Sequence, residues 1–423
     1  MSEFAHGLLL QDQGRLEEAE ACFYSVLAQE PENDYCYFRL SLCQMTQEGK
    51  KQRALESVEA AIRLQPLDST YHAIRAVILA ALRRGTQALT AAEEAISLAP
   101  EDALARAAKA NALSSMERWA ESEQWCLLAL ECDPDHSMAA NLLAHVLRMQ
   151  GKSVENADAV AALLAADPED SMAHVNAGWS ALQRGDRKQA EVHFREALRL
   201  DPESDVARTG LIESFRARSV FYRAYLAYTF FLQRFTAGKQ WAIMIGLYAI
   251  YQIARANLKL IDPRLSVGFV FLWLALVFWI WLAPGVGNFL ILMDRSARLA
   301  LDRQGAWLGL AVGGGLTLGA VLLAGGWYLG IIPLLLAGVG ILVSTVPASL
   351  TFGNESRTGR WVFGGITGLA YAASIFLPLL EAFRLDAKTL HPLTALIGSV
   401  VLLAAMLCTW LGNVRALRQG DEG

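Results

Sequence analysis

Residues 185–202, Gly-Asp-Arg-Lys-Gln-Ala-Glu-Val-His-Phe-Arg-Glu-Ala-Leu-Arg-Leu-Asp-Pro, read as one complete helix followed by its stop signal. The final proline recurs upstream as Pro168, Pro134, Pro100 and Pro66, each 34 residues apart, and as Pro31 after a step of 35. This interval is typical of a helix-turn-helix unit that must stack on its neighbours to bury its apolar face. The sequence therefore predicts an all-α solenoid of six units over residues 1–204.

The six units share small residues where their two helices would touch. Twelve residues before each proline stand Ala19, Ala54, Ala88, Ser122, Asn156 and Ala190. Eight before it, the first and sixth units carry Phe23 and Phe194. Helices approach closely only where side chains are small, and an aromatic ring can then fill the space beyond. The period and these residues resemble the tetratricopeptide repeat family, which implies that the first helix of each unit lines a concave face that binds peptide segments.

Two places depart from the family pattern. Asn156 stands where alanine is expected, so either the register slips by one residue to Ala157 or a polar group is half-buried there. One extra residue near 47–50 accounts for the single 35-residue step.

Charge divides the chain into two halves. Residues 1–217 carry 21 Lys+Arg against 34 Asp+Glu, a net charge of −13, whereas residues 218–423 carry 16 against 8, a net of +8. This contrast predicts a water-soluble domain followed by a membrane domain whose short loops hold the cations. The amino terminus has no basic region ahead of an apolar run, so we expect the first domain to stay in the cytoplasm. Its acidity makes nucleic acid a poor partner.

Residues 205–238 lack proline and alternate aromatic with basic side chains, as in Phe221, Tyr222 and Arg223. They are interpreted as a capping or juxtamembrane amphipathic segment of one or two helices. A helix packed on the last repeat and a helix at the bilayer surface both fit this pattern.

Residues 239–414 are predicted to form a polytopic membrane domain of six spans. Five stretches have no charged residue: Gln240–Ala254, Leu265–Met293, Gln304–Asn354, Trp361–Leu380 and Thr389–Val414. The third has 51 residues and must contain two spans, since a helix needs about 20 residues to cross the hydrocarbon. The first has only 15 residues, or about 22 Å of helix, so Lys239 and Arg255 would have to reach out to the interface.

Loop charges favour six spans over five. With a cytoplasmic amino terminus, six spans place 11 Lys+Arg inside and 5 outside, whereas five spans give 9 and 7. The outer cations would include Arg384 and Lys388, and residues 415–423 would be a short cytoplasmic tail. The chain as a whole resembles uncharacterised bacterial membrane proteins with an amino-terminal tetratricopeptide domain, which implies the bacterial cytoplasmic (inner) membrane.

Glycines on the third span suggest close helix packing. Gly305, Gly309 and Gly313 form a double GxxxG. Packing inside the bundle is one interpretation, and a homo-oligomer interface or a path for lipid is the other. A transporter or channel would instead need a polar path, for which the candidates are Asn288, Thr317, Ser344, Thr345 and Ser374.

No pattern for catalysis, a cofactor or a metal is present. The sequence has no GxSxG, HExxH, P-loop or Rossmann glycine pattern, and its six cysteines match no CxxC site. The cysteines are interpreted as small buried apolar residues, and a membrane enzyme with an unrecognised site is an alternative. We expect a non-enzymatic scaffold or assembly factor that recruits a protein partner to the membrane.

The concave face supplies the candidate binding residues. Alignment on the prolines places there Phe4, Leu8, Tyr35, Phe38, Leu42, Met45, Met138, His145, Met172, Val175 and Trp179. Some of these side chains would only support the neighbouring helix. Asn111, Asn141 and Asn176 lack basic partners in the places that the family uses to hold a chain terminus. The expected ligand is therefore an internal apolar or basic segment held by aromatic and Met side chains.

Overall fold

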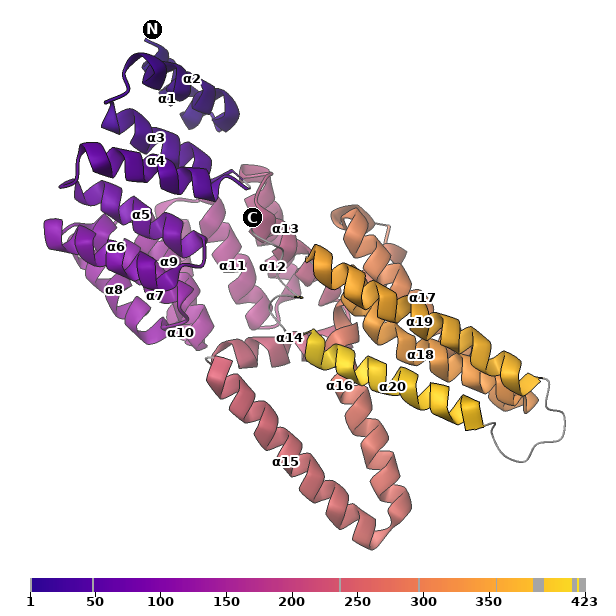
Figure 1. Cartoon of the computed structure of the whole chain (residues 1–423). Coiled ribbons are helices and arrows are strands. Elements are labelled where there is room, and N and C mark those ends of the chain that lie inside the picture. The colour runs from indigo at the N-terminus through magenta and orange to yellow at the C-terminus, as the bar shows by residue number, and fades with distance from the viewer. Residues whose placement is uncertain are drawn as a thin grey trace. The chain divides into compact units, whose positions relative to one another are not determined.

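The computed structural model describes residues 2–47, 49–235, 237–295, 297–354, 356–382, 392–412 and 417, and all the regular elements in these ranges are helical (Figure 1). The first fourteen helices are α1 Glu3–Asp12, α2 Leu16–Gln29, α3 Asp34–Met45, α4 Lys51–Leu64, α5 Ser69–Ala81, α6 Gly85–Leu98, α7 Ala103–Ser115, α8 Trp119–Cys132, α9 Ser137–Gln150, α10 Ser153–Ala166, α11 Ser171–Gln183, α12 Arg187–Leu200, α13 Asp205–Arg216 and α14 Val220–Gln233. Longer helices follow as α15 Ala237–Ile261, α16 Pro263–Met293, α17 Arg303–Leu329, α18 Ile332–Phe352, α19 Arg357–Ala382 and α20 Pro392–Leu411, with a 3₁₀ turn, η1 Arg298–Ala300, before α17.

The chain divides into two compact units. The first comprises residues 1–184 and 196–202, and the second comprises residues 185–195 and 203–423. Each unit is described by itself.

Six helix pairs, α1/α2 to α11/α12, follow the proline spacing. The capping residue stands two residues after the proline, and the first helix of the next pair begins at the residue that follows the cap. Asn33, Asp68, Asp102 and Asp170 each accept a hydrogen bond from a backbone N–H of the first turn. A side-chain oxygen at this position satisfies one of the N–H groups that a helix start leaves unpaired. The motif proline-x-cap thus fixes where the second and later repeats begin.

The turn inside each helix pair uses the left-handed backbone region. Gly14, Gly49, Gly151 and Gly185 have φ between 74° and 83°. The third and fourth pairs lack this glycine, and Arg83 and Glu117 take its place with φ of 58° and 60°. A non-glycine residue is strained there because its Cβ approaches the following carbonyl oxygen.

The column of small residues lies in the core of the repeats, and it includes two polar members. Ser122 and Asn156 are both buried, and each donates a 2.7 Å hydrogen bond to a carbonyl twelve residues earlier, that of Ala110 and Ala144 respectively. The register therefore does not slip to Ala157. Asn156 is more fully buried than the half-buried state that the sequence suggested, and its amide is satisfied by the paired helix.

Two helices, α13 and α14, occupy the segment after Pro202. They repeat the length and spacing of a helix pair, and Ser204 caps α13 at the position that Asp170 holds one repeat earlier. Gly210 of α13 packs on the buried ring of Phe194, since a Cβ there would lie 2.2 Å from Phe194 Cε1. The capping segment is therefore a helix pair, not a single helix.

In the part of the chain that the structure describes, four helices are long and apolar enough to cross a membrane: α16, α17, α18 and residues 392–409 of α20. The sequence predicted six spans. The two predicted spans that are not among these four helices correspond to α15 and α19. The sequence of α15 includes three cations, Lys239, Arg255 and Lys259.

Within the second unit, α17, α18 and α19 lie side by side (Figure 1). Glycines let these helices and α16 approach their neighbours closely. A Cβ at Gly309 would lie 2.9 Å from the backbone nitrogen of Phe289, and a Cβ at Gly313 would lie 2.0 Å from the Cγ of the same residue. A Cβ at Gly305 would lie 3.4 Å from Asn288 Nδ2. The double GxxxG face is thus covered by α16 of the same chain. It is not free to form the homo-oligomer interface considered from the sequence.

Arg384 and Lys388, assigned to an outer loop, lie outside the described residues, as does all of the predicted tail 415–423 except Leu417.

Candidate functional site

Aromatic rings on the first helices of the first three repeats form a continuous row. Phe4 of α1 lies 5.8 Å from Tyr35 of α3, Tyr35 lies 5.8 Å from Phe38, and Phe38 lies 5.1 Å from Tyr71 of α5, measured between ring centroids. Tyr71 also donates a 2.7 Å hydrogen bond to Asp34. Tyr35 is 44% exposed, Phe4 and Phe38 are half-buried, and Tyr71 is buried. We call these four residues the aromatic row.

The sequence identified three members of this row and missed Tyr71, because Tyr71 stands five residues after its proline and Tyr35 stands four after its own. Other predicted groove residues belong to the packing between helices. Leu8, Leu42, Met45 and Met138 pack against buried clusters, and Val175 is only 3% exposed. Met172 remains exposed.

The later predicted residues His145 and Trp179 meet around an arginine that the sequence analysis passed over. Arg148 of α9 places its guanidinium carbon 5.7 Å from the ring centre of Trp179, and its Nη2 lies 3.2 Å from His145 Nδ1. The ring of Trp119 meets the His145 ring edge-on at 6.1 Å. We call Arg148, His145, Trp119 and Trp179 the arginine cage.

Burial determines the charge state of this cage. It lowers the pKa of His145 to about 4, with a further contribution from the charge of Arg148, so the imidazole is neutral near pH 7. Burial also lowers the pKa of Arg148, to about 10, which still leaves the guanidinium charged. The cage therefore carries one positive charge.

Arg148 could have been found from the sequence, because it stands fourteen residues after Pro134, as Met45 stands fourteen after Pro31. A search for apolar side chains alone excluded it. Beside the cage, Asn176 donates a 2.9 Å hydrogen bond to Asn141, and Asn141 donates a 2.7 Å bond to Asp170. These asparagines are thus joined to one another and are not isolated.

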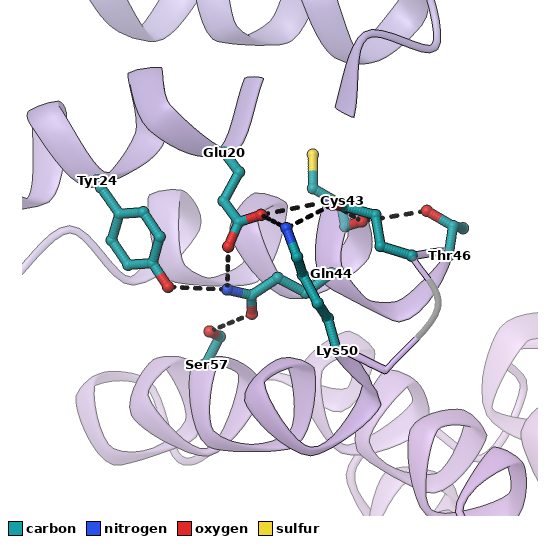
Figure 2. A network of polar contacts seen from close by, with 8 residues as sticks. Glu20, Tyr24, Cys43, Gln44, Thr46, Lys50 and Ser57 are labelled. Carbon is teal, nitrogen blue, oxygen red and sulfur yellow. Dashed lines mark hydrogen bonds and ion pairs between the residues drawn. The ribbon is translucent and has the colours of Figure 1, made fainter. Parts of the chain in front are cut away.

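A buried polar network joins the first two repeats (Figure 2). Gln44 is fully buried, and its Nε2 donates to Glu20 Oε1 at 3.1 Å and to the Tyr24 hydroxyl at 3.0 Å, while its Oε1 accepts from Ser57 at 2.8 Å. Lys50 completes the network with a 2.7 Å ion pair to Glu20. Burial alone would raise the pKa of Glu20, but hydrogen bonds from Lys50 and Gln44 outweigh it and the pKa is lowered.

The same arrangement recurs three repeats later. Glu123 accepts from Gln150 and from Lys152, both at 2.7 Å, as Glu20 accepts from Gln47 at 3.3 Å and from Lys50. The two glutamates and the two glutamines are 103 residues apart, whereas the two lysines are 102 apart. The extra residue of the second repeat therefore falls between Gln47 and Lys50, as the sequence predicted. These networks connect neighbouring repeats.

Asn288, the first candidate for a polar path, makes structural hydrogen bonds. Its Oδ1 accepts from Arg216 Nε at 2.8 Å and its Nδ2 donates to the Gly305 carbonyl at 2.9 Å. Arg216 also forms a 2.6 Å ion pair with Glu213. Burial alone would lower the pKa of Arg216, but Glu213 and Tyr222 outweigh it and the pKa is raised.

The hydroxyl candidates for a polar path are bonded to their own helices. Thr317, Ser344, Thr345 and Ser374 each donate to a backbone carbonyl three or four residues earlier. Ser344 and Ser374 also lie 3.3 Å apart and join α18 to α19. This arrangement is typical of hydroxyl groups packed between helices.

The described residues contain no cluster of three His, Cys, Asp or Glu side chains arranged for a metal. Cys36, Cys43, Cys126 and Cys408 are buried, Cys22 is half-buried and Cys132 is exposed. Burial raises the pKa of the Cys36 and Cys126 thiols to about 12. Such thiols remain protonated and are poor nucleophiles.

Family models described as tetratricopeptide repeats match residues 4–69, 47–93, 75–137 and 171–204. Residues 4–137 and 171–204 are tetratricopeptide repeats. The resemblance inferred from the proline spacing is thereby confirmed for these residues, and the matches end at residue 204. The unmatched interval, 138–170, contains Asn156, which departs from the family pattern. No curated protein matches the chain.

Several solved structures are similar to about half of this chain. A repeat protein from Parabacteroides merdae shares 17% identity over 49% of this chain and 81% of its own, with a TM-score of 0.44. PilW, described as a widely conserved type IV pilus biogenesis factor, shares 14% sequence identity over 49% of this chain and 96% of its own chain, with a TM-score of 0.40. YrrB, described as a tetratricopeptide repeat protein with an unusual peptide-binding site, shares 18% sequence identity over 44% of this chain and 95% of its own chain, with a TM-score of 0.29.

Proposed function

We propose that this protein is a membrane-anchored scaffold or assembly factor that binds a partner protein on the first helices of its repeats. The aromatic row carries the proposal. Rings from α1, α3 and α5 form one surface across three repeats, and Tyr35 is its most exposed member. Aromatic side chains contribute a large share of binding energy at protein interfaces because they bury much apolar area with few rotatable bonds. An extended or helical segment of a partner could lie along this row.

The second unit supports the membrane anchor. Trp307 and Trp327 stand 20 residues apart on α17 and are 52% and 84% exposed. At 1.5 Å per residue they are separated by about 30 Å along the helix, which is about the thickness of the hydrocarbon core. Tryptophans gather at the two membrane interfaces. The helix is therefore proposed to cross the bilayer between them.

The proposed topology has six spans, α15 to α20, with a cytoplasmic amino terminus. The loop charges favour it by 11 to 5, and α15, at 25 residues, is longer than its uncharged stretch. About 37 Å of helix is enough to cross the core with Lys239 and Lys259 near its ends. Epitope tags at residue 2 and after Arg298 should be cytoplasmic, and a tag near Lys259 should be outside. A cytoplasmic Lys259 would remove the first span from the proposal.

A purely non-enzymatic role is part of the proposal. Among the described residues, Ser344 and Ser374 of the membrane helices bond to their own backbone, Asn288 bonds to Arg216 and to the Gly305 carbonyl, and four of the six thiols are buried. A transporter is the less favoured alternative, because Asn288 and the hydroxyls are engaged in packing.

Crosslinking in native membranes followed by purification of the full-length chain would test the function. Phe38→Ala combined with Trp179→Ala should weaken partner capture by about 2 kcal/mol or more, on the order of an interface hot spot, while membrane insertion is unchanged. Leu127→Ala is the matched control, because Leu127 is exposed on a second helix, α8. Undiminished capture by the double variant, or a requirement for a free carboxyl terminus on the partner, would contradict the proposed groove.

A further inference from the structure

Arg148 is a buried charge without a carboxylate partner. It is 9% exposed, whereas Glu20, the other buried carboxylate or cation in the described residues, pairs with Lys50, and the largely buried Arg216 pairs with Glu213. No Asp or Glu in the described residues forms an ion pair with Arg148. A buried charge without a counter-charge is costly, and the Trp179 ring offsets only part of that cost.

Two hydrogen-bond donors in the arginine cage are also unsatisfied. Arg148 Nε and Trp119 Nε1 are fully enclosed and have no partner. Both side chains border the neutral ring of His145. Buried donors of this kind are rare in folded proteins, and each one calls for an explanation. Together with the unpaired charge, they indicate a missing acceptor that carries a negative charge.

We infer that the arginine cage binds the carboxylate of an Asp or Glu side chain on the partner segment, an inference that rests on the proposed scaffold function. The planar guanidinium fork matches the two oxygens of a carboxylate. The cage has a single positive charge, which suits one carboxylate better than a doubly charged phosphate. The strongly acidic first half of the chain would repel a segment rich in acids. The partner segment is therefore an apolar or basic one with one acidic anchor.

The anchor also explains why an energetically unfavourable residue stands at this position. Met45 occupies the equivalent place in the second repeat, where it packs against the core. Arg148→Met should therefore give an unliganded protein at least as stable as the wild type, because it removes an uncompensated buried charge. If Arg148 had only a structural role, the same change would lower stability.

The test uses the full-length protein in lipid nanodiscs and a displayed library of random nonapeptides whose carboxyl ends are fused to the coat protein. The wild type should select peptides with Asp or Glu at one fixed position, and Arg148→Met should not. Changing that Glu to Gln in a selected, amidated peptide should raise its Kd on the order of tenfold or more for the wild type, as expected for a charged hydrogen bond. The same change should leave binding to Arg148→Met unaltered.

Arg148→Lys keeps the charge but loses the fork, so it should bind with intermediate affinity. Arg53→Met, an exposed arginine on α4, should behave as the wild type. Selected peptides without an acidic position, equal losses for the wild type and Arg148→Met, or selection only from a library with free carboxyl ends would overturn the anchor. Those outcomes leave the scaffold function standing, which fails instead if crosslinking captures no protein.

Discussion

Arg216 Nε donates a 2.8 Å hydrogen bond to Asn288 Oδ1, which joins α13 to the apolar helix α16. The Nδ2 of the same Asn288 amide donates a 2.9 Å hydrogen bond to the Gly305 carbonyl of α17. Phe215 and Ile291 pack beside this bond and are both buried. One asparagine thus connects three helices of the second unit, beside a cluster of buried apolar side chains.

Asn288→Leu should destabilise the second unit by about 1.5–3 kcal/mol, because it removes a hydrogen bond to a buried charged group. Arg216 would keep Glu213 but lose the acceptor at Nε. Thermal unfolding of the full-length protein in detergent would measure the change. Asn257→Leu is the matched control, because Asn257 is exposed on α15 and bonds only its own helix. Equal stability of the two variants would show that the Arg216 contact is dispensable.

The repeats could be predicted from the sequence because their signals are local. Each proline lies two residues before a cap such as Asp68 or Asp102, and both the cap and the proline act on the adjacent turn. The small-residue column also predicted the close contacts of Ala19 and Ala190, which are fully buried. Such features recur at a fixed period, so one repeat confirms the next.

The functional contacts could not be predicted because they join distant or atypical residues. Arg216 and Asn288 are 72 positions apart, and no period relates them. Arg148 occupies the repeat position that Met45 occupies in the second repeat. The role of a polar residue at this position cannot be inferred until the structure places Trp119 and Trp179 around it. Membrane spans were predicted from uncharged stretches and from the charges of the loops between them, which indicate α16 clearly and leave α15 ambiguous.

Gly210→Ala should destabilise the junction of α12 and α13 by about 1–3 kcal/mol, the usual cost of overpacking. The new Cβ would lie 2.2 Å from Phe194 Cε1, so the ring or the helix must move. Gly246→Ala provides the contrast, since no atom lies within 4 Å of a Cβ there and alanine favours the helix. Chemical denaturation of both full-length variants would compare them. A neutral Gly210→Ala would mean that Phe194 can turn away at little cost.

Arg83→Gly and Glu117→Gly should each stabilise the repeats by about 0.5–1 kcal/mol. Both residues have positive φ, and the gain from relieving this strain exceeds the entropy that glycine adds to the unfolded chain. Gly151→Ala tests the reverse change, because it places a Cβ on a residue with φ of 76° and should lose about 1 kcal/mol. Midpoints of urea unfolding give the sign, and a loss of stability in both glycine variants would refute the strain.

Stability of the middle repeats should fall as the pH is lowered, in two stages. The first involves His145, whose pKa is lowered from 6.5 to about 4 by burial and by the charge of Arg148. Between these values the unfolded chain binds a proton that the folded chain excludes, so the folded state loses stability as the pH falls. The second stage involves Glu123, whose pKa is lowered from 4.5. Burial opposes this shift, but Lys152 and Gln150 outweigh it. Its contribution is present above pH 4.5 and is lost below that.

Hydrogen exchange of the α9 and α10 amides in the full-length protein, corrected for the intrinsic pH dependence, would follow both stages. His145→Gln should flatten the decline between pH 6.5 and 4.5, because a glutamine does not titrate, and should leave the decline below pH 4.5. Glu123→Gln should leave the decline between pH 6.5 and 4.5 unchanged and should flatten the decline below pH 4.5. A change of about 1.4 kcal/mol accompanies each unit of pKa shift, so the His145 stage should amount to a few kcal/mol at most. A decline above pH 4.5 that persists in His145→Gln would assign the titration to another group and would show that the imidazole is not enclosed beside Arg148.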